Sequence, residues 1–244
     1  MTEYTFKNID NEGENTLQTI ALANHLNEWM YATIKPHCKG KVMEIGSGIG
    51  NISEFFLNDN IPILLSDIRE SYCKALRGKF EGFKPLLGIE MMNLTDSDFD
   101  LKFSKYFNSF DTVFALNVVE HIYDEQLAIA NCYKLLKPGG HLIILVPAYQ
   151  WLFNSFDSEL FHYRRYTRRR LEKVFTSNQF QVKHSQYFNA AGIAGWLVSG
   201  KIQHHKIIPK GQIRLFNNLV FFFRLFDKLI MNTFGLSVIT VGVK

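Results

Sequence analysis

The sequence predicts an α/β fold whose core is a parallel sheet covered by helices on both faces. Three observations carry this prediction. Apolar segments of strand length alternate with amphipathic segments of helix length over residues 41–146. The apolar segments are continuous, as in strands that are buried on both faces. A glycine-rich turn joins the first apolar segment to the first helical one.

Each predicted element follows from the spacing of apolar residues and from the glycines and prolines that interrupt it. Pro36 and Gly40 end the first helix, and the Lys-Pro-Gly-Gly segment at 137–140 ends the helix before the fifth strand. The expected strands are 41–45, 61–65, 85–92, 111–116, 141–146, 180–188 and 236–243. The expected helices are 16–34, 49–58, 69–79, 124–136 and 167–178, followed by a helical, apolar region over 190–231.

We expect a single domain over residues 1–244, because no linker, internal repeat or low-complexity tract divides the chain. A chain of 244 residues is long enough for one well-buried α/β domain with an added lobe. The expected parts are an N-terminal helix (14–35), a core (40–150), a loop with a helical insertion (151–231) and a closing strand (236–243).

The composition is that of a soluble globular protein, with 47% hydrophobic and 20% charged residues. Cys38, Cys73 and Cys132 have no paired or metal-type spacing, which suits a reducing cytosol. The N-terminus lacks the pattern of a signal peptide, and no apolar run reaches the ~20 residues of a membrane span. We expect a cytoplasmic protein, and peripheral contact with the inner face of the membrane stays open.

Positive charge is concentrated in one stretch. Residues 161–216 hold eleven Lys or Arg and one acid, a net charge of +10, whereas the whole chain carries +4 and the remainder therefore −6. A basic lobe on an acidic body suits an anionic partner, such as a phosphate, a carboxylate, a nucleic acid or an anionic bilayer. A solvated basic surface explains the same charges equally well.

The turn at residues 46–50 is the strongest local signal. Gly46, Gly48 and Gly50 permit positive φ and let a ligand approach the backbone. The helix that follows turns its first N–H groups toward that ligand, so we expect a cofactor that carries a nucleoside. A dinucleotide fingerprint needs a third small residue where this chain has Asn51, which disfavours NAD.

Polar residues follow the second, third and fourth predicted strands at their carboxyl ends, where open α/β sheets bind ligands. Asp67 lies 23 residues after Glu44 and is placed to accept hydrogen bonds from both hydroxyls of a ribose. Asn93 and Leu94 follow the third strand, where an adenine would lie, and residues 117–121 follow the fourth. A turn-capping role explains each residue taken singly, but together they indicate one ligand site.

With these motifs the chain resembles the class I S-adenosylmethionine-dependent methyltransferases. The resemblance rests on Glu44–Gly50, Asp67, 110–121 and 135–145, and it spans nearly all of residues 14–188 plus the closing strand. It implies a Rossmann-like sheet of seven strands in the order 3-2-1-4-5-7-6, with strand seven antiparallel. It also implies S-adenosyl-L-methionine as the cofactor, released as S-adenosyl-L-homocysteine.

The resemblance further implies which residues contact the cofactor. They are Glu44, Gly46, Ser47, Gly48, Gly50, Asn51, Asp67, Ile68, Asn93, Leu94, Asn117 and Val118. Asn93 departs from the family, in which many members carry Asp. Its carbonyl oxygen is still able to accept a hydrogen bond from an adenine amine.

The basic loop after the fifth strand, residues 161–167, reads Phe-His-Tyr-Arg-Arg-Tyr-Thr. It resembles a group of bacterial methyltransferases with an His-x-Arg-Arg-Tyr-Thr stretch, whose members tend to act on small molecules or envelope-related metabolites. Methyl transfer from a sulfonium is an in-line displacement, and a base is needed where the nucleophile must lose a proton. His121 and His162 are the candidate bases, and a structural role explains His121 equally well.

The arginines of this loop are the candidates for holding the acceptor. Thr167 is a helix cap, yet Arg168–Arg170 occupy the first turn that follows it. Cations there oppose the helix dipole, at roughly 0.3–1 kcal/mol each, and a broken local rule without visible compensation favours a functional role. We expect Arg164, Arg165 and Tyr166 to bind a carboxylate or phosphate of the acceptor, since arginine suits bidentate recognition.

Residues 214–231 predict a helix with more apolar surface than one contact with a sheet edge buries. Three explanations compete: a lid over an apolar acceptor pocket, a homodimer interface and an interfacial membrane helix. We favour the lid, because an insertion between the last two strands lies near the carboxyl ends of the strands. The acceptor would then be a small aromatic or lipid-like acid that is methylated on oxygen.

Nucleic-acid methylation is the main enzymatic alternative, because of the basic lobe. Enzymes that methylate the amino groups of bases or glutamine usually carry Asn/Asp-Pro-Pro-aromatic after strand four, whereas residues 117–120 read Asn-Val-Val-Glu, and no RNA-binding module is recognisable. A non-catalytic scaffold or regulatory protein that binds S-adenosylmethionine is the alternative from another class. No metal is expected, because the sequence does not supply the carboxylate cluster of catechol-type chemistry.

Overall fold

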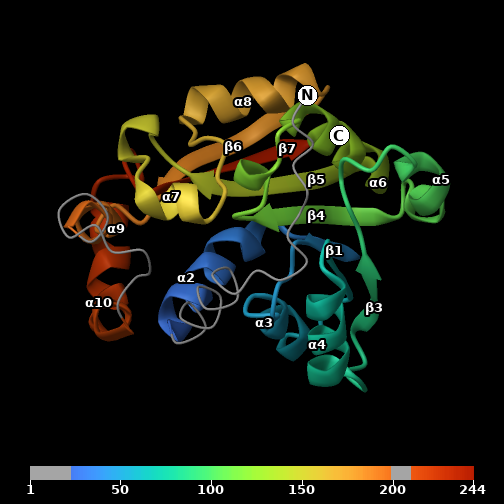
Figure 1. Ribbon diagram of the computed structural model, residues 1–244, viewed down its shortest axis with the longest axis horizontal. Helices are drawn as coiled ribbons and strands as arrows, with labels where there is room; N and C mark the ends of the chain where they lie inside the picture. The colour runs from blue at the N-terminus through green and yellow to red at the C-terminus, as the bar shows by residue number, and fades with distance from the viewer. Residues whose placement is uncertain (1–22, 199–209) are drawn as a thin grey trace.

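The computed structural model describes residues 23–198 and 210–244, and a seven-stranded sheet forms its centre (Figure 1). The strands are β1 (Val42–Ile45), β2 (Ile63–Asp67), β3 (Leu86–Met91), β4 (Phe110–Leu116), β5 (Leu136–Pro147), β6 (Gln181–Phe188) and β7 (Ser237–Val243). Their order is β3-β2-β1-β4-β5-β7-β6. β7 is antiparallel to β5 and β6, and the other neighbours are parallel. The predicted α/β class, strand order and antiparallel last strand are confirmed.

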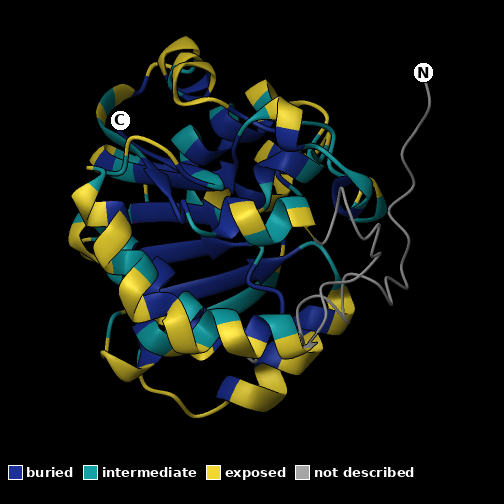
Figure 2. Cartoon of the chain, turned by 90° about the vertical axis from the view of Figure 1, so that its left-hand side faces the viewer, coloured by how far each residue is buried: buried dark blue, intermediate teal, exposed yellow. Residues whose placement is uncertain are grey.

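Helices cover both faces of the sheet (Figures 1 and 2). The helices of one face are α2 (Asn24–Ile34), α3 (Ser53–Asn58) and α4 (Glu70–Phe80), and those of the other are α5 (Phe99–Phe103), α6 (Glu125–Leu135) and α8 (Arg168–Ser177). Short elements lie between them: η1 (Lys35–His37), η2 (Ser104–Tyr106), η3 (Val119–His121), η4 (Gln150–Leu152) and α7 (Ser155–Glu159).

The two faces of β5 explain why the strands are continuously apolar. Leu142 and Ile144 belong to the core that includes α6 and α8, whereas Ile143 and Leu145 belong to the core that includes α2 and α3. Successive side chains of a strand point to opposite faces. A strand with helices on both sides therefore needs an apolar residue at every position, and Figure 2 shows the sheet buried between helices with exposed outer surfaces.

Among the described strands and helices of residues 41–188, three begin more than one residue from the predicted start. β2 begins at Ile63, two residues later than expected, because Pro62 has no N–H to donate to a ladder. α3 begins at Ser53, since a positive φ at Gly50 is incompatible with a helix at that residue. β5 begins at Leu136, five residues early, because the Lys-Pro-Gly-Gly segment lies within the strand beside an irregular register with β4.

The predicted helical region over 190–231 contains α9 (Gly192–Trp196) and α10 (Lys210–Leu229). Residues 199–209, and the part of the predicted N-terminal helix before residue 23, lie outside the described residues. α10 packs against α2. Asp227, buried on α10, accepts hydrogen bonds from the N–H groups of Asn189 (2.6 Å) and Ala190 (2.9 Å) and so ties the helix to the end of β6. Among the described helices, none combines the length and apolar character that crossing a membrane requires.

Candidate cofactor and acceptor site

The glycine turn between β1 and α3 has the conformation that its sequence predicts. Gly46, Gly48 and Gly50 have φ values of 72°, 53° and 82°, in the region that glycine enters without strain. A Cβ at Gly46 would overlap the side chain of Val118, and a Cβ at Gly50 would overlap the ring of Phe80. The turn therefore needs glycine at these two positions for both its backbone conformation and its packing.

Asp67 connects the end of β2 to this turn. One carboxylate oxygen accepts a hydrogen bond from the Gly48 N–H at 2.9 Å, and the other accepts from the Arg69 N–H at 2.9 Å. Burial raises the pKa of Asp67 above its usual value, although these backbone hydrogen bonds oppose that rise. The carboxylate lies at the carboxyl end of β2, where Asp67 is expected to hold a ribose.

Glu44 is a second buried carboxyl group beneath the turn. It is 4% exposed and accepts a hydrogen bond from the hydroxyl of Ser53. Burial raises its pKa to about 7, the hydroxyls of Ser53 and Ser47 oppose that rise, and the charge of Asp67 adds to it. A carboxyl group with this pKa would ionise fully once a cation lay beside it.

Asn93 and Leu94 lie at the end of β3, as expected, but both already have partners. The side-chain oxygen of Asn93 accepts hydrogen bonds from the N–H (2.9 Å) and the hydroxyl (3.0 Å) of Thr95. Leu94 is 3% exposed and belongs to the core on the side of α6. These contacts give Asn93 a turn-capping role, and contact of either residue with an adenine stays a prediction.

The other predicted cofactor residues lie together at the carboxyl edge of the sheet. Asn117 follows β4, is exposed and has a positive φ of 55°, while its N–H donates to the Leu145 carbonyl at 2.8 Å. Val118 lies against Gly46. The Ser47 N–H donates to the Ser66 carbonyl at 2.8 Å. The ends of β1, β2 and β4 are therefore adjacent, and residues 44–51, 67–68 and 117–118 lie along one edge.

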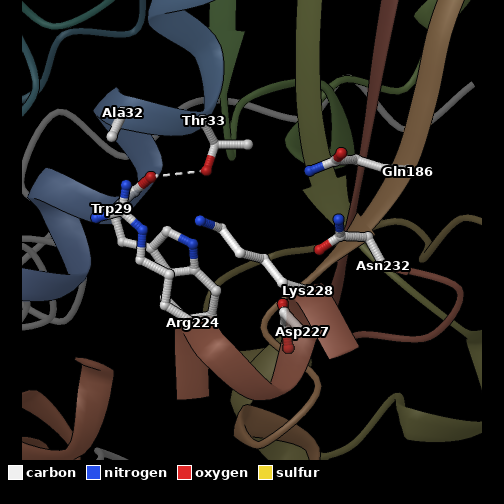
Figure 3. A pocket seen from close by; sticks show the side chains of 8 residues that line it. All are labelled: Trp29, Ala32, Thr33, Gln186, Arg224, Asp227, Lys228 and Asn232. Carbon is white, nitrogen blue, oxygen red and sulfur yellow. Dashed lines mark hydrogen bonds between the residues drawn. The ribbon is translucent and has the colours of Figure 1, made fainter. Parts of the chain in front are cut away.

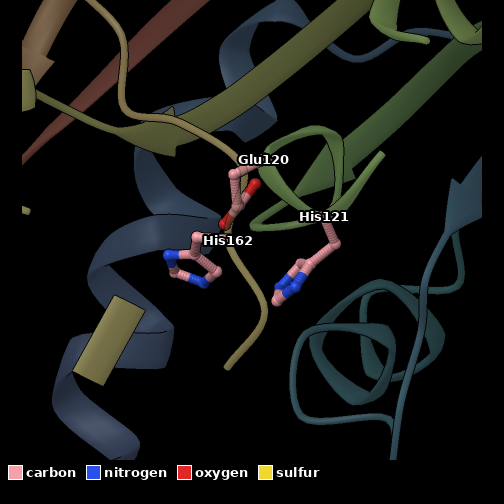
Figure 4. Close-up of side chains that lie close together, drawn as sticks. All are labelled: Glu120, His121 and His162. Atoms are coloured by element: carbon pink, nitrogen blue, oxygen red, sulfur yellow. The ribbon is translucent and has the colours of Figure 1, made fainter. Parts of the chain in front are cut away.

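A cluster of three side chains follows β4 on the acceptor side (Figure 4). Glu120 and His121 come from η3, and His162 comes from the loop after α7. The two imidazole rings are 4.5 Å apart at their centroids, and one nitrogen or oxygen from each of the three residues lies within 4.8 Å of the others. The structure thus brings together the two predicted catalytic histidines, which are 41 positions apart in the sequence.

Burial controls the protonation of two members of this cluster. Glu120 is completely buried, and neither of its oxygens has a hydrogen-bond partner on another residue. Burial raises its pKa to about 8, although its own backbone N–H and the charge of Arg165 oppose that rise. Burial, together with the neighbouring His162, lowers the pKa of His121 to about 3. Without a ligand, both Glu120 and His121 are therefore neutral near pH 7.

His162 is oriented by a buried ion pair. Its Nδ1 lies 2.8 Å from Oδ1 of Asp157, and Nε of Arg165 donates to the same oxygen at 2.8 Å. Burial alone would raise the pKa of Asp157, but hydrogen bonds from His162 and Arg165 outweigh that effect and lower it. With Nδ1 donating to Asp157, Nε2 of His162 is left as the acceptor nitrogen.

The predicted acceptor-binding residues have internal partners. Arg165 is 2% exposed and lies over the ring of Trp196, and Tyr166 is completely buried. Arg164 pairs with Glu125 at 3.0 Å, and the Tyr166 hydroxyl donates to the same carboxylate. This arrangement corrects the expectation of direct acceptor contact for Arg165 and Tyr166, because their polar groups are directed into the protein, where they support the loop.

The charges at the start of α8 are partly offset by one acid on α6 and one acid within α8. Arg170 lies 3.1 Å from Glu125, and Arg168 lies 3.8 Å from Glu172. Glu125 is on α6, which packs against α8. The pair with Glu172 is visible in the local sequence as an i,i+4 spacing, whereas the pair with Glu125 is not. The unfavourable dipole charges are therefore not by themselves a sign of function.

Sequence inspection missed two residues of this site. Glu120 belongs to the segment that follows β4, but the sequence assigns it no role of its own. Its complete burial without a partner has no signal in the sequence. Asp157 lies five residues before His162, and its only local signal is the capping box that it forms with Asn154 at the start of α7. That box indicates a helix start and gives no indication of a histidine partner.

Comparisons with known proteins agree with the fold and with a methyltransferase domain. Residues 43–142 match a family described as a methyltransferase domain. A probable S-adenosylmethionine-dependent methyltransferase of Mycolicibacterium smegmatis is 24% identical over 189 residues, which cover 75% of this chain and 70% of that protein. A crystal structure of an S-adenosylmethionine-dependent methyltransferase from Archaeoglobus fulgidus has a TM-score of 0.58 at 20% identity, covers 89% of this chain and is covered over 94% of its own length. That similarity shows the shared fold.

Other curated relatives are matched over less of their length. The chain spans about half (49%) of a ubiquinone/menaquinone biosynthesis C-methyltransferase of Cronobacter sakazakii, to which it is 25% identical over 128 residues covering 50% of this chain. It spans 6% of a probable polyketide synthase of Dictyostelium discoideum, to which it is 27% identical over 156 residues covering 54% of this chain. These relatives differ widely in what their names say they make.

Proposed function

We propose that this chain, which belongs to the class I S-adenosylmethionine-dependent methyltransferases, methylates a small acceptor that is anionic and partly apolar, most simply on oxygen. The observation that carries the proposal is the position of His121 and His162. They lie next to each other just beyond β4, on the same edge of the sheet as the glycine turn and Asp67.

The residues at this edge fit S-adenosylmethionine. The turn at Gly46 has no room for a Cβ, Asp67 provides a carboxylate for ribose hydroxyls, and Glu44 provides a buried carboxyl group that a cationic ammonium would ionise. When bound, the cofactor supplies an activated methyl group and a neutral leaving group. The protein must align the acceptor with that methyl group and exclude water, and alignment alone is worth ~7–11 kcal/mol.

His121 and His162 are the residues that we place against the nucleophilic atom of the acceptor. Two chemistries are open to them: one imidazole accepts the proton of the acceptor, or the pair holds a cation that stabilises the deprotonated acceptor. In either role Asp157 and Arg165 act as positioning residues, because they fix the ring of His162 and do not face the acceptor.

The positive charge at the start of α8 supports an anionic acceptor, because part of it remains after the internal ion pairs are counted. Arg168, Arg169 and Arg170 are exposed at the start of α8, where Glu172 and Glu125 offset only part of their charge. A field of this sign raises the local concentration of anions near the loop. It does not distinguish a phosphate from a carboxylate.

We also propose that α10 lies on an anionic membrane surface and that the acceptor is lipid-like. Apolar side chains on α10 follow a spacing of four and three, with exposed fractions from 36% to 79%: Leu215, Leu219, Phe222, Phe226 and Leu229. A lid would hide this stripe over the pocket, whereas here it faces solvent. Arg214, Arg224 and Lys228 are on the same helix, so self-association would bring cations together, while anionic headgroups would neutralise them.

A hollow beside this helix supports the same proposal. It has a volume of about 260 Å³ and lies between α2, β6 and α10 (Figure 3). Arg224 and Lys228 line it together with Trp29 and Thr33, and the carboxylate of Asp227 is already engaged by two backbone N–H groups. Such a lining suits the phosphate or carboxylate of a lipid headgroup.

Methyl transfer is tested in two steps. Calorimetry with S-adenosylmethionine and S-adenosylhomocysteine should give one site per chain. Release of S-adenosylhomocysteine should then be followed with a panel of phenols, aromatic acids, fatty acids and anionic lipids. His162→Gln should retain cofactor binding and lose turnover, and His184→Gln, at an unrelated histidine on β6, is the control. Cofactor binding without turnover on any acceptor would instead support a non-catalytic role.

Membrane binding is tested by co-sedimentation with vesicles of phosphatidylcholine alone and of phosphatidylcholine with phosphatidylglycerol. The protein should bind only the anionic vesicles, and more weakly as salt rises. Phe222→Asp should abolish binding. Leu101→Asp is the matched control, because Leu101 is 83% exposed on α5, far from α10 in the chain. Equal binding by both variants would refute a role for α10, and a dimer lost only in Phe222→Asp would favour the homodimer interface.

A further inference from the structure

We propose that Glu120, His121 and His162 bind a divalent cation. The cation would be one that accepts both imidazole and carboxylate ligands, such as Zn²⁺, Mn²⁺ or Fe²⁺. The three side chains come from two segments and converge on one point (Figure 4), with donor atoms within 4.8 Å of one another. Bonds of ~2.0–2.2 Å to such a cation need somewhat closer donors, which small rotations of the two imidazoles supply. Two histidines and one carboxylate leave further coordination positions open.

Glu120 is the strongest observation. Its side chain is completely buried, and neither of its oxygens has a hydrogen-bond partner on another residue. Buried carboxyl oxygens without partners are rare, because each has lost its hydration without replacement. A role of His121 or His162 as a proton acceptor leaves these oxygens unexplained. A cation at the centre of the cluster would satisfy Glu120 and would favour its ionised form.

The outer ring nitrogen of His162 provides an independent observation. Nδ1 of His162 is bound to Oδ1 of Asp157 at 2.8 Å. Histidines that bind metals almost always donate their other ring N–H to a carboxylate or a backbone carbonyl. His162 has such a partner, so its other ring nitrogen is left for a ligand in the cluster.

Arg165 completes the outer shell. It is 2% exposed and donates to the same Asp157 oxygen that holds His162. The arginine keeps Asp157 ionised and in place, so that this carboxylate orients His162 and does not itself enter the cluster. The sequence predicts that Arg165 binds the acceptor. In the cation site, the buried Arg165 instead positions His162, through Asp157, as a ligand of the cation.

The inference rests on the proposed function for its chemistry. A cation in this site would hold an acceptor hydroxyl at an open position and stabilise its anion, and the proton would pass to solvent. That oxygen would form the bond to the methyl carbon while the carbon–sulfur bond breaks, and the electron pair would remain on sulfur as a neutral thioether. His121 and His162 would then be ligands, and neither would accept a proton.

Cation binding is measured without methyl transfer. The full chain is freed of metal with a chelator and titrated with Zn²⁺ by calorimetry and with Co²⁺ by visible absorption, which reports imidazole ligation. We expect one cation per chain. Glu120→Gln and His162→Gln should weaken binding by at least about 100-fold, and Asp157→Asn by about 10–100-fold, the range typical of partners that orient a metal-bound histidine.

His184→Gln is the matched control. His184 stacks on His37 with ring centroids 4.8 Å apart. This second pair of histidines among the described residues could also attract a metal, but it lies outside the proposed site. This variant should bind as the wild type does. Calorimetry with S-adenosylmethionine checks that every variant is folded, and His162→Gln, which replaces a ring on a loop and introduces no new charge, keeps the test decisive if Glu120→Gln fails to fold.

The outcomes separate this inference from the proposed function. Absence of a one-to-one site, or equal binding by the wild type and His162→Gln, overturns the cation site. Full turnover by chelator-treated, metal-free protein also overturns it, while the methyltransferase proposal stands. The protein could also bind a cation through Glu120 and His162 and yet methylate no acceptor in the panel. That result would support the cation site and refute the proposed function.

Discussion

Replacing Glu44 by Gln should make the stability of the cofactor-free protein less dependent on pH. Burial raises the pKa of Glu44 from 4.5 to about 7, so the folded protein retains a proton that the unfolded chain has released. This stabilising contribution is complete below pH 4.5 and is lost as pH rises through about 7. A shift of this size corresponds to roughly 3 kcal/mol, most of which falls between pH 5 and pH 8.

Urea unfolding at pH 5, 6, 7 and 8 measures the effect. The wild type should lose roughly 2–3 kcal/mol more than Glu44→Gln between pH 5 and pH 8, because all other titrating groups are common to both. Glu54→Gln is the control, since Glu54 is exposed on α3 and pairs with Lys79 at 2.8 Å. Parallel curves for the wild type and Glu44→Gln would refute a protonated Glu44 in the folded state.

Three further substitutions test the turn, the loop and α10. Gly46→Ala should lower the free energy of unfolding by about 1–3 kcal/mol and weaken cofactor binding, because it adds a steric overlap to a strained φ. Gly82→Ala, at a φ of 86° in open space, is the control and should have a smaller effect on both stability and cofactor binding. Tyr166→Phe should lower the free energy of unfolding by about 1–3 kcal/mol, since its hydroxyl donates to a carboxylate of α6; an unchanged urea midpoint would contradict this. Asp227→Ala leaves two buried N–H groups without an acceptor, at about 1–3 kcal/mol each, and limited proteolysis should then cut next to α10 sooner than in Lys228→Ala.

The fold could be predicted from the sequence because its signals are local. Continuous apolar strands, amphipathic helices and the glycines between them determine the element order, and strand β7 is apolar enough to complete the sheet. The errors came from backbone chemistry within single segments. Pro62 delays β2, and the positive φ of Gly50 delays α3.

The conformation of the edge where we expect the cofactor was also predictable, since Gly46, Gly50 and Asp67 act through the backbone next to them. The acceptor side was not. A sequence shows that Arg165 is charged but not that it is buried, and its partner Asp157 is recognisable only once the loop has folded back around α7. Whether the carboxylate oxygens of Glu120 find a hydrogen-bond partner depends on every segment packed around them. No local sequence pattern indicates that.

The loop that carries His162 is held by several hydrogen bonds of its backbone N–H groups. The N–H of His162 donates to the Asp157 carbonyl at 2.8 Å, that of Tyr163 to the Glu120 carbonyl at 2.9 Å, and that of Tyr166 to the Pro147 carbonyl at 2.8 Å. These amide protons should exchange slowly with deuterium before any ligand is added. A loop that is ordered in advance loses little entropy when the acceptor arrives. Its opening should therefore not limit turnover, and the release of S-adenosylhomocysteine is a more natural candidate for the slow step.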